Sequence, residues 1–317
     1  MAGDPDDTVR LNGRLPDRVT GAAHPVARRR PGARLIAAGL AVALACGAAG
    51  WLLLAPDSRV RQAPPTVASP VQPATPLLTQ AEILALEPSA PQLLRLRENP
   101  QVFVLLFPDL DAQGAAMNRL AALVEKRGLP RDRVLGAAEL TAAIAAGGDT
   151  PGTWFYGHDY RGRDLARFFA LAERDGVPLN PAELWVARQW RQARAEAEGE
   201  IALVSIAVAG PGLDAAMRAS ILRHEIGHGH YFTWAGLAAH VHQVWRSGFT
   251  AAERAAFRSF LEREGYEDSD EELMANETMA YLLFTPDPRL FSASMVGLGE
   301  AVVERLRGLM RAGPALP

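Results

Sequence analysis

The hydrophobic positions of this chain separate one membrane-length apolar run from a longer region of mixed helix and strand patterns. The run from Leu35 to Ala55 contains 21 residues without a charge, which is about the length that crosses the hydrocarbon core of a bilayer. An arginine cluster at 28–34 precedes it and favours an N-terminus in the cytoplasm. We therefore predict a transmembrane signal anchor at 35–55.

The segments that flank this run are polar. Residues 1–34 are rich in Arg, Asp, Pro and Gly, so we expect a disordered cytoplasmic tail. Residues 56–76 contain six prolines and are typical of an extended linker. Ala43-Leu44-Ala45 also fits a signal-peptidase site, so secretion after cleavage is the alternative to an anchor.

From residue 77 onward, strand and helix patterns follow one another. Gln101–Leu106 and Ile201–Val208 are short runs rich in strand-forming residues, and we predict buried strands there. Helical spacing predicts helices over 111–127, 164–174 and 181–198, each ending near a glycine. We expect a mixed α/β part at 77–199 and a mostly helical part at 200–317.

The second part contains three predicted helices. One begins near Leu213 and runs through residue 230. Thr250 and Glu253 form a capping-box pattern for the next, which ends near Gly265. Ser269 as N-cap, with Glu272 three residues on, predicts a third that ends near Thr285.

Composition narrows the function classes. The net charge is -3, and the chain has no basic stripe and no zinc-finger spacing, so we expect no nucleic-acid partner. Lys126 is the only lysine among many arginines, and this bias, with abundant alanine, indicates a GC-rich bacterial genome.

The sequence His224-Glu225-Ile226-Gly227-His228 concentrates metal-binding chemistry in one helical turn. Residues i and i+4 share a helix face, so His224 and His228 can bind one Zn²⁺ at about 2.0–2.1 Å. Glu225, about 100° round the helix, can act as general base on a water that zinc activates. Gly227 costs about 1 kcal/mol relative to Ala in a helix, which close packing near the metal would explain.

The third ligand that a catalytic zinc needs is predicted downstream. Glu277 lies on the apolar face of the helix that follows Ser269, with Leu273, Met274, Ala280, Tyr281 and Phe284. A carboxylate in an apolar stripe must bind metal or be paired. Glu277 is therefore our predicted ligand, and a buried ion pair with an arginine is the alternative. The weaker candidates for the ligand are His230, His240 and His242.

Two further features leave alternatives open. The run Trp154–Tyr160 either lines a substrate site or packs as a loop, and packing is the favoured interpretation. A donor to a tetrahedral oxyanion could come from any of five side chains: Tyr231, His240, His242, Tyr266 and Tyr281.

His224-Glu225-x-x-His228 followed by Asn276-Glu277-x-x-Ala280 resembles the gluzincin metallopeptidases, whose aminopeptidase branch has a similar N-E-x-x-A. The resemblance covers roughly 200–285. It implies that His224, His228 and Glu277 bind zinc and that Glu225 is the base. It also implies a zincin-like fold whose cleft is lined by an edge strand, a role that Ile201–Val208 would suit. The 48 residues between His228 and Glu277 exceed that branch's spacing, so the metal chemistry carries over and the substrate class does not.

The sequence thus predicts an α+β, zincin-like zinc metallopeptidase preceded by a single transmembrane helix. We expect it in a bacterial inner membrane, with the catalytic part outside the cytoplasm. Its substrate would be a peptide or protein, and cell-wall peptide is one candidate. The alternative function is a catalytically inactive, zinc-containing module of the cell envelope that binds a peptide or a partner.

Overall fold

The fold was analysed in a computed structural model that describes residues 74–315. The predicted tail, the predicted signal anchor at 35–55 and most of the predicted linker lie outside the described residues. Within the described part, no helix is long and apolar enough to cross a membrane.

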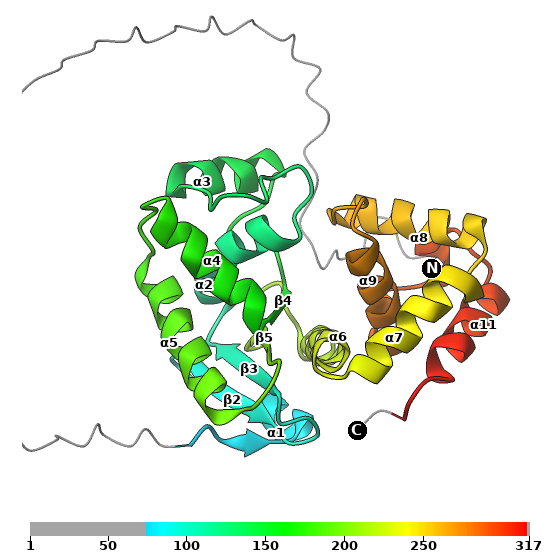
Figure 1. The fold of residues 1–317 in the computed structure, drawn as a ribbon, viewed down its shortest axis with the longest axis horizontal. Coiled ribbons are helices and arrows are strands. Elements are labelled where there is room, and N and C mark those ends of the chain that lie inside the picture. Colours follow the sequence, from blue (N-terminus) through cyan, green and yellow to red (C-terminus); the bar gives the residue numbers. More distant parts are fainter. Residues whose placement is uncertain (1–73, 316–317) are drawn as a thin grey trace, which may run out of the picture. The chain divides into compact units, whose positions relative to one another are not determined.

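One five-stranded sheet organises the described residues (Figure 1). The strands are β1 (Leu77–Leu78), β2 (Gln92–Leu96), β3 (Val102–Phe107), β4 (Gly157–Arg161) and β5 (Ala202–Ala207). Their order is β1-β2-β3-β5-β4. β3 and β5 pair in parallel, while β2 and β4 run antiparallel to them on either side. The sheet takes strands from both sides of residue 200, so the two predicted parts share it.

The predicted strands at 101–106 and 201–208 are confirmed, but the place expected for the second is wrong. β5 pairs with β3 on one side and β4 on the other, and all six of its residues are buried. A strand paired on both sides cannot present an edge to a cleft. The edge strand next to β5 is instead β4, formed by the end of the aromatic run that we expected to pack as a loop.

Helices cover both faces of the sheet (Figure 1). In the first half they are α1 (Gln80–Leu84), α2 (Leu110–Val124), α3 (Ala137–Ala146), α4 (Gly162–Arg174) and α5 (Pro181–Glu196). The second half has α6 (Ala215–Thr233), α7 (Ala235–Gln243), the π-helical turn η1 (Val244–Gly248), α8 (Ala251–Glu264), α9 (Glu271–Phe284), α10 (Ala293–Val296) and α11 (Glu300–Arg311). The fold is mixed α/β with a single sheet in this part of the chain.

Alternation along the central strands sorts side chains into two cores. Phe103, Leu105 and Phe107 of β3 pack with the helices α2, α4 and α5. Val102 and Val104, on the opposite face, pack with α6 and the C-terminal helices. Because successive side chains of a strand point to opposite faces, a fully apolar strand serves both cores.

Two predicted helix ends differ from the structure. α2 ends at Val124 rather than near 127, because the chain turns at Glu125 to meet 265–267. There the Arg127 N–H donates to the Gly265 carbonyl at 3.0 Å, and the Glu267 N–H donates to the Glu125 carbonyl at 3.2 Å. Ser269 was predicted as the N-cap of α9, but Asp270 takes that position. Its carboxylate accepts from the N–H groups of Glu272 and Leu273.

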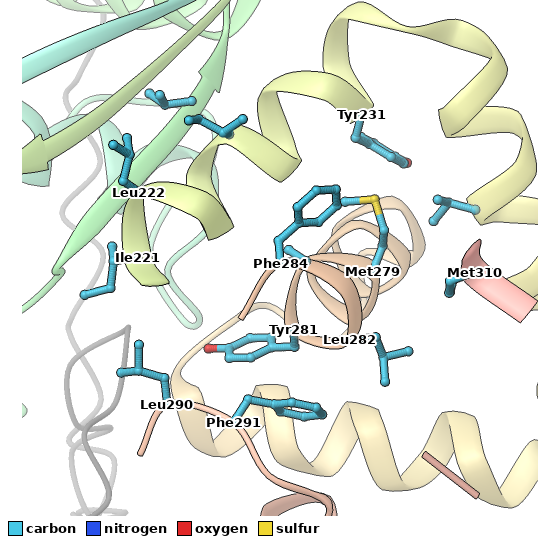
Figure 2. Packing of buried hydrophobic residues seen from close by; sticks show 14 of the residues in the cluster. Ile221, Leu222, Tyr231, Met279, Tyr281, Leu282, Phe284, Leu290, Phe291 and Met310 are labelled. Atoms are coloured by element: carbon cyan, nitrogen blue, oxygen red, sulfur yellow. The ribbon is translucent and has the colours of Figure 1, made fainter. Parts of the chain in front are cut away.

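α6 lies between the sheet and the C-terminal helices (Figure 1) and is buried through most of its length. Two glycines permit this. A Cβ at Gly227 would lie 2.5 Å from the Phe284 ring, and one at Gly229 would lie 2.8 Å from Val102 of β3. Figure 2 shows Phe284 on the side of α9 that faces α6. The close packing predicted at Gly227 is therefore confirmed.

Candidate metal centre

Two helices bring the three predicted ligands together. His224 and His228 lie one turn apart on α6, and Glu277 faces them from α9. The two Nε2 atoms are 3.0 Å apart. Glu277 Oε2 is 3.6 Å from His224 Nε2, and its Oε1 is 3.6 Å from His228 Nε2. The Glu277 carboxylate thus faces the two histidines. The alternative, a buried ion pair between Glu277 and an arginine, is not what the described residues show.

These separations fit a tetrahedral zinc site. Ligands bound at about 2.0–2.1 Å in a tetrahedron lie about 3.3 Å from one another, and the three observed distances, 3.0, 3.6 and 3.6 Å, bracket this value. All three side chains are at most 2% exposed. The donor set of two imidazoles and one carboxylate, with a fourth position left for water or substrate, is the type that catalytic zinc uses.

The surroundings of His224 fix its tautomer. Thr285 Oγ1 donates to the Ala280 carbonyl at 3.0 Å, so this hydroxyl accepts from His224 Nδ1–H, 2.8 Å away. The lone pair of His224 is then on Nε2, which points toward Glu277. Burial also lowers the pKa of His224 to about 3 and that of His228 to about 4. Both imidazoles are therefore neutral, the form that binds metal.

The predicted base, Glu225, is held beneath the edge strand. Its carboxylate occupies the space that a side chain at Gly157 of β4 would need, since a Cβ there would lie 2.1 Å from Glu225 Oε1. Glu225 is 4% exposed, and its Oε2 has no hydrogen-bonding partner among the described residues. Burial raises the pKa of Glu225 well above its usual range, and the charges of Glu277 and Glu125 raise it further. A divalent ion between the histidines and Glu277 would offset that repulsion.

Two side chains beside the ligands, Tyr266 before α9 and Asn276 on α9, act on the charge of the site. Burial raises the pKa of Glu277, whereas His228, where it is protonated, and a hydrogen bond from Tyr266 lower it. The side chain of Asn276 raises the pKa of His228, although neither His228 Nδ1 nor Asn276 Oδ1 has a well-aligned hydrogen bond in the part of the chain described. The Asn-Glu pair of the sequence motif, on α9, thus acts on the histidines of α6.

The structure removes the rival histidines from the site. His230 Nδ1 is 3.1 Å from the Asn99 side chain. His240 Nε2 is 3.0 Å from the Leu309 carbonyl, and His242 Nε2 is 2.8 Å from the Tyr231 hydroxyl. Each therefore has a partner of its own away from Glu277.

Of the five candidate oxyanion donors, two tyrosines lie beside the ligands. The Tyr281 ring is 4.9 Å from the His224 ring, centroid to centroid. Its buried hydroxyl has no well-aligned hydrogen bond among residues 74–315, although the Tyr266 side chain lowers its pKa. Tyr266 bonds to Glu277, as described above. Tyr231 and His242 bond to each other, and His240 bonds to the backbone, so these three are occupied.

Sequence reasoning missed two acidic residues of the site. Asp159 Oδ2, on β4, is 3.8 Å from His228 Nδ1. Glu125 follows α2 and accepts a hydrogen bond of 2.7 Å from the Tyr160 hydroxyl. Burial raises the pKa of Glu125 to about 8. Asp159 could have been suspected, because it is an acidic residue within the aromatic run 154–160. Nothing in the sequence around Glu125 indicated that this residue lies at the metal centre.

Comparison of the chain with models of protein families, with curated proteins and with solved structures found no match. The chemistry of the site is therefore argued from its own residues.

Proposed function

We propose that this chain is a zinc-dependent metallopeptidase that hydrolyses peptide bonds. The observation that carries the proposal is the set of three neutral or anionic ligand atoms of His224, His228 and Glu277, which are buried and spaced for one tetrahedral ion. Zinc held there would polarise a carbonyl group and bring the pKa of a water to about 7. A zincin-like arrangement, with the segments before 74 anchoring the protein in a bacterial membrane, belongs to the same proposal.

Glu225 is the group that we propose as general base. Its carboxylate lies on α6 beside the two histidines and is not one of the three proposed ligands. One of its oxygens has no hydrogen-bonding partner among the described residues. In hydrolysis it would take a proton from the attacking water and later deliver it to the leaving amine. A purely structural zinc site has four protein ligands and no use for such a buried acid.

The edge strand gives the peptide a place to bind. Among residues 74–315, β4 pairs with β5 alone, and it packs beside α6. An extended substrate can add to the unpaired side of such a strand through main-chain hydrogen bonds. Gly157, beside Glu225, would then bring the peptide backbone to the ligands.

The proposal is tested by metal content and hydrolysis together. We expect about one zinc per chain in the purified full-length protein and a loss of zinc in Glu277→Ala. The control Glu271→Ala, which changes an exposed residue of the same helix, should keep it. Glu225→Gln should keep zinc and lose hydrolysis of a peptide library by at least about 10²-fold.

The outcomes separate the two functions. Zinc in the wild type with no hydrolysis of any peptide, and peptide binding unchanged in Glu225→Gln, would favour the inactive binding module. Absence of zinc from the wild type would refute both.

A further inference from the structure

The metal centre contains more buried acid than one zinc ion requires. Glu125 and Asp159 are 5% and 10% exposed, and neither is a member of the His224, His228 and Glu277 set. A carboxylate oxygen from each of Glu125, Asp159 and Glu277 lies within 4.8 Å of the other two. The three acids come from the end of α2, from β4 and from α9, so the fold, and not one local motif, brings them together.

Charge counting shows the size of the excess. Four carboxylates, those of Glu125, Asp159, Glu225 and Glu277, surround two neutral histidines. One divalent ion offsets two negative charges and leaves two. Arg131 and Lys126 act on Glu125, and Arg161 and Arg167 line the pocket that Asp159 shares. The charged groups that act most strongly on Asp159 are nevertheless all acidic, with Glu225 first. Buried charge without a counter-charge is costly, so Asp159 either holds a proton, as its raised pKa allows, or has a further cation beside it.

A polar side chain outside the acidic group also points to a ligand. Asn276 is 3% exposed, and its Oδ1 makes no well-aligned hydrogen bond among the described residues, although the side chain acts on His228. It lines the same pocket of about 160 Å³ as Glu125 and Asp159. A water molecule takes about 30 Å³ of liquid volume, so the pocket has room for an ion with several waters.

We propose that Glu125, Asp159 and Asn276, with Glu277 shared between two ions, form a second divalent cation site. Its donors are all oxygens, which suit a hard ion such as Mn²⁺ or Mg²⁺ that keeps part of its water shell. The imidazole-containing set beside it suits zinc. Two divalent ions balance the four carboxylates. The proposal rests on the proposed function, because Glu277 belongs to both sites.

The experiment counts each metal separately. The full-length protein is stripped with a chelator and reloaded with one equivalent of Zn²⁺. It is then titrated with Mn²⁺ while free Mn²⁺ is measured by electron paramagnetic resonance. We expect one zinc and one additional Mn²⁺ per chain. Asp159→Asn should weaken Mn²⁺ binding by about tenfold or more and leave zinc bound, and Glu125→Gln should act in the same direction.

The control removes the same charge from the same pocket. Asp164 also lines it but is not among the three converging acids, so Asp164→Asn should leave the Mn²⁺ affinity unchanged within about twofold. Retained zinc in each variant shows that the site has folded.

Two results would overturn the second site. One is a wild-type chain that binds one zinc and no Mn²⁺, which would leave protons or an ammonium group of the substrate to balance Asp159. The other is equal weakening by Asp159→Asn and Asp164→Asn, which would indicate general electrostatic attraction. If the chain binds no zinc at all, the proposed function fails first, and the zinc count reports this independently.

Discussion

At the residue scale, a missing side chain decides where the base lies. Gly157 has a backbone conformation open to other residues, since its φ is not among the positive values. What excludes a side chain there is the Glu225 carboxylate, 2.1 Å from where a Cβ would be built. The Glu225 carboxylate can therefore lie against β4 only because residue 157 has no side chain.

We expect Gly157→Ala to push Glu225 out of position while the zinc ligands stay in place. A misplacement of about 1 Å can cost on the order of 10² in rate, so peptide hydrolysis should fall by roughly that factor with zinc content unchanged. Metal analysis and steady-state kinetics measure the two quantities. Gly210→Ala is the control, because a Cβ there meets nothing within 4 Å. Full activity in Gly157→Ala would show that Glu225 is not the base.

The residues of the proposed site differ in how far the sequence could predict them. His224, Glu225 and His228 lie within about one helical turn, so the 3.6-residue period of a helix was enough to predict that they lie close together. Glu277 followed from a carboxylate on an apolar helix face, and the structure brings it to the histidines. Asp159 and Glu125 reach the site through strand pairing and through the turn after α2, and those long-range contacts leave no local pattern.

At the element scale, the contact between α6 and α9 holds the ligands in register. The Phe284 ring of α9 occupies the space that a side chain at Gly227 of α6 would need. The two helices bury a shared apolar core, in which Figure 2 shows Phe284. The sequence predicted both helices and their ends within a few residues, because capping residues and prolines mark them. It did not predict β4, whose mixture of Gly, His and Asp lacks the apolar alternation of a strand.

Gly227→Ala tests this contact. A helix-interior alanine normally stabilises by about 1 kcal/mol relative to glycine, but overpacking against Phe284 should cost about 1–3 kcal/mol. We expect a net loss of unfolding free energy in urea titrations. In the control Gly308→Ala, on α11, a Cβ meets nothing within 4 Å, so that change should stabilise.

The double variant Gly227→Ala with Phe284→Leu isolates the pair. If the ring is the obstacle, the two changes together should cost less than their sum, with a coupling free energy of about 0.5–3 kcal/mol. Strictly additive losses would mean that Gly227 is required for another reason.

At the scale of the whole molecule, the candidate centre joins the sheet side to the helical side. Its ligands come from α6, which packs on β5, and from α9, which packs with α8 and α11. An ion bound by the folded chain and not by the unfolded chain stabilises the fold by mass action. Metal at 1,000 times its dissociation constant would contribute about 4 kcal/mol.

We therefore expect chelation to lower the melting temperature by roughly 8–16 °C, since about 1 kcal/mol corresponds to 2–4 °C in a domain of this size. Scanning calorimetry with and without zinc measures the shift. Glu277→Ala should melt at one temperature in both conditions, because it lacks the ligand that joins α9 to α6. A zinc-dependent shift that survives in that variant would place the ion elsewhere.

The parallel pairing of β3 with β5 has a consequence for synthesis of the chain. Val102 pairs with Ala202, so β3 leaves the ribosome 100 residues before its partner. At a synthesis rate of about 5–20 residues per second, one edge of β3 stays without its partner β5 for about 5–20 s. During this time β3, which is wholly apolar, can pair only with β2. During that interval the nascent chain is open to aggregation. A chaperone bound to nascent chains would therefore be expected to raise the yield of this protein most strongly between the emergence of residues 107 and 207.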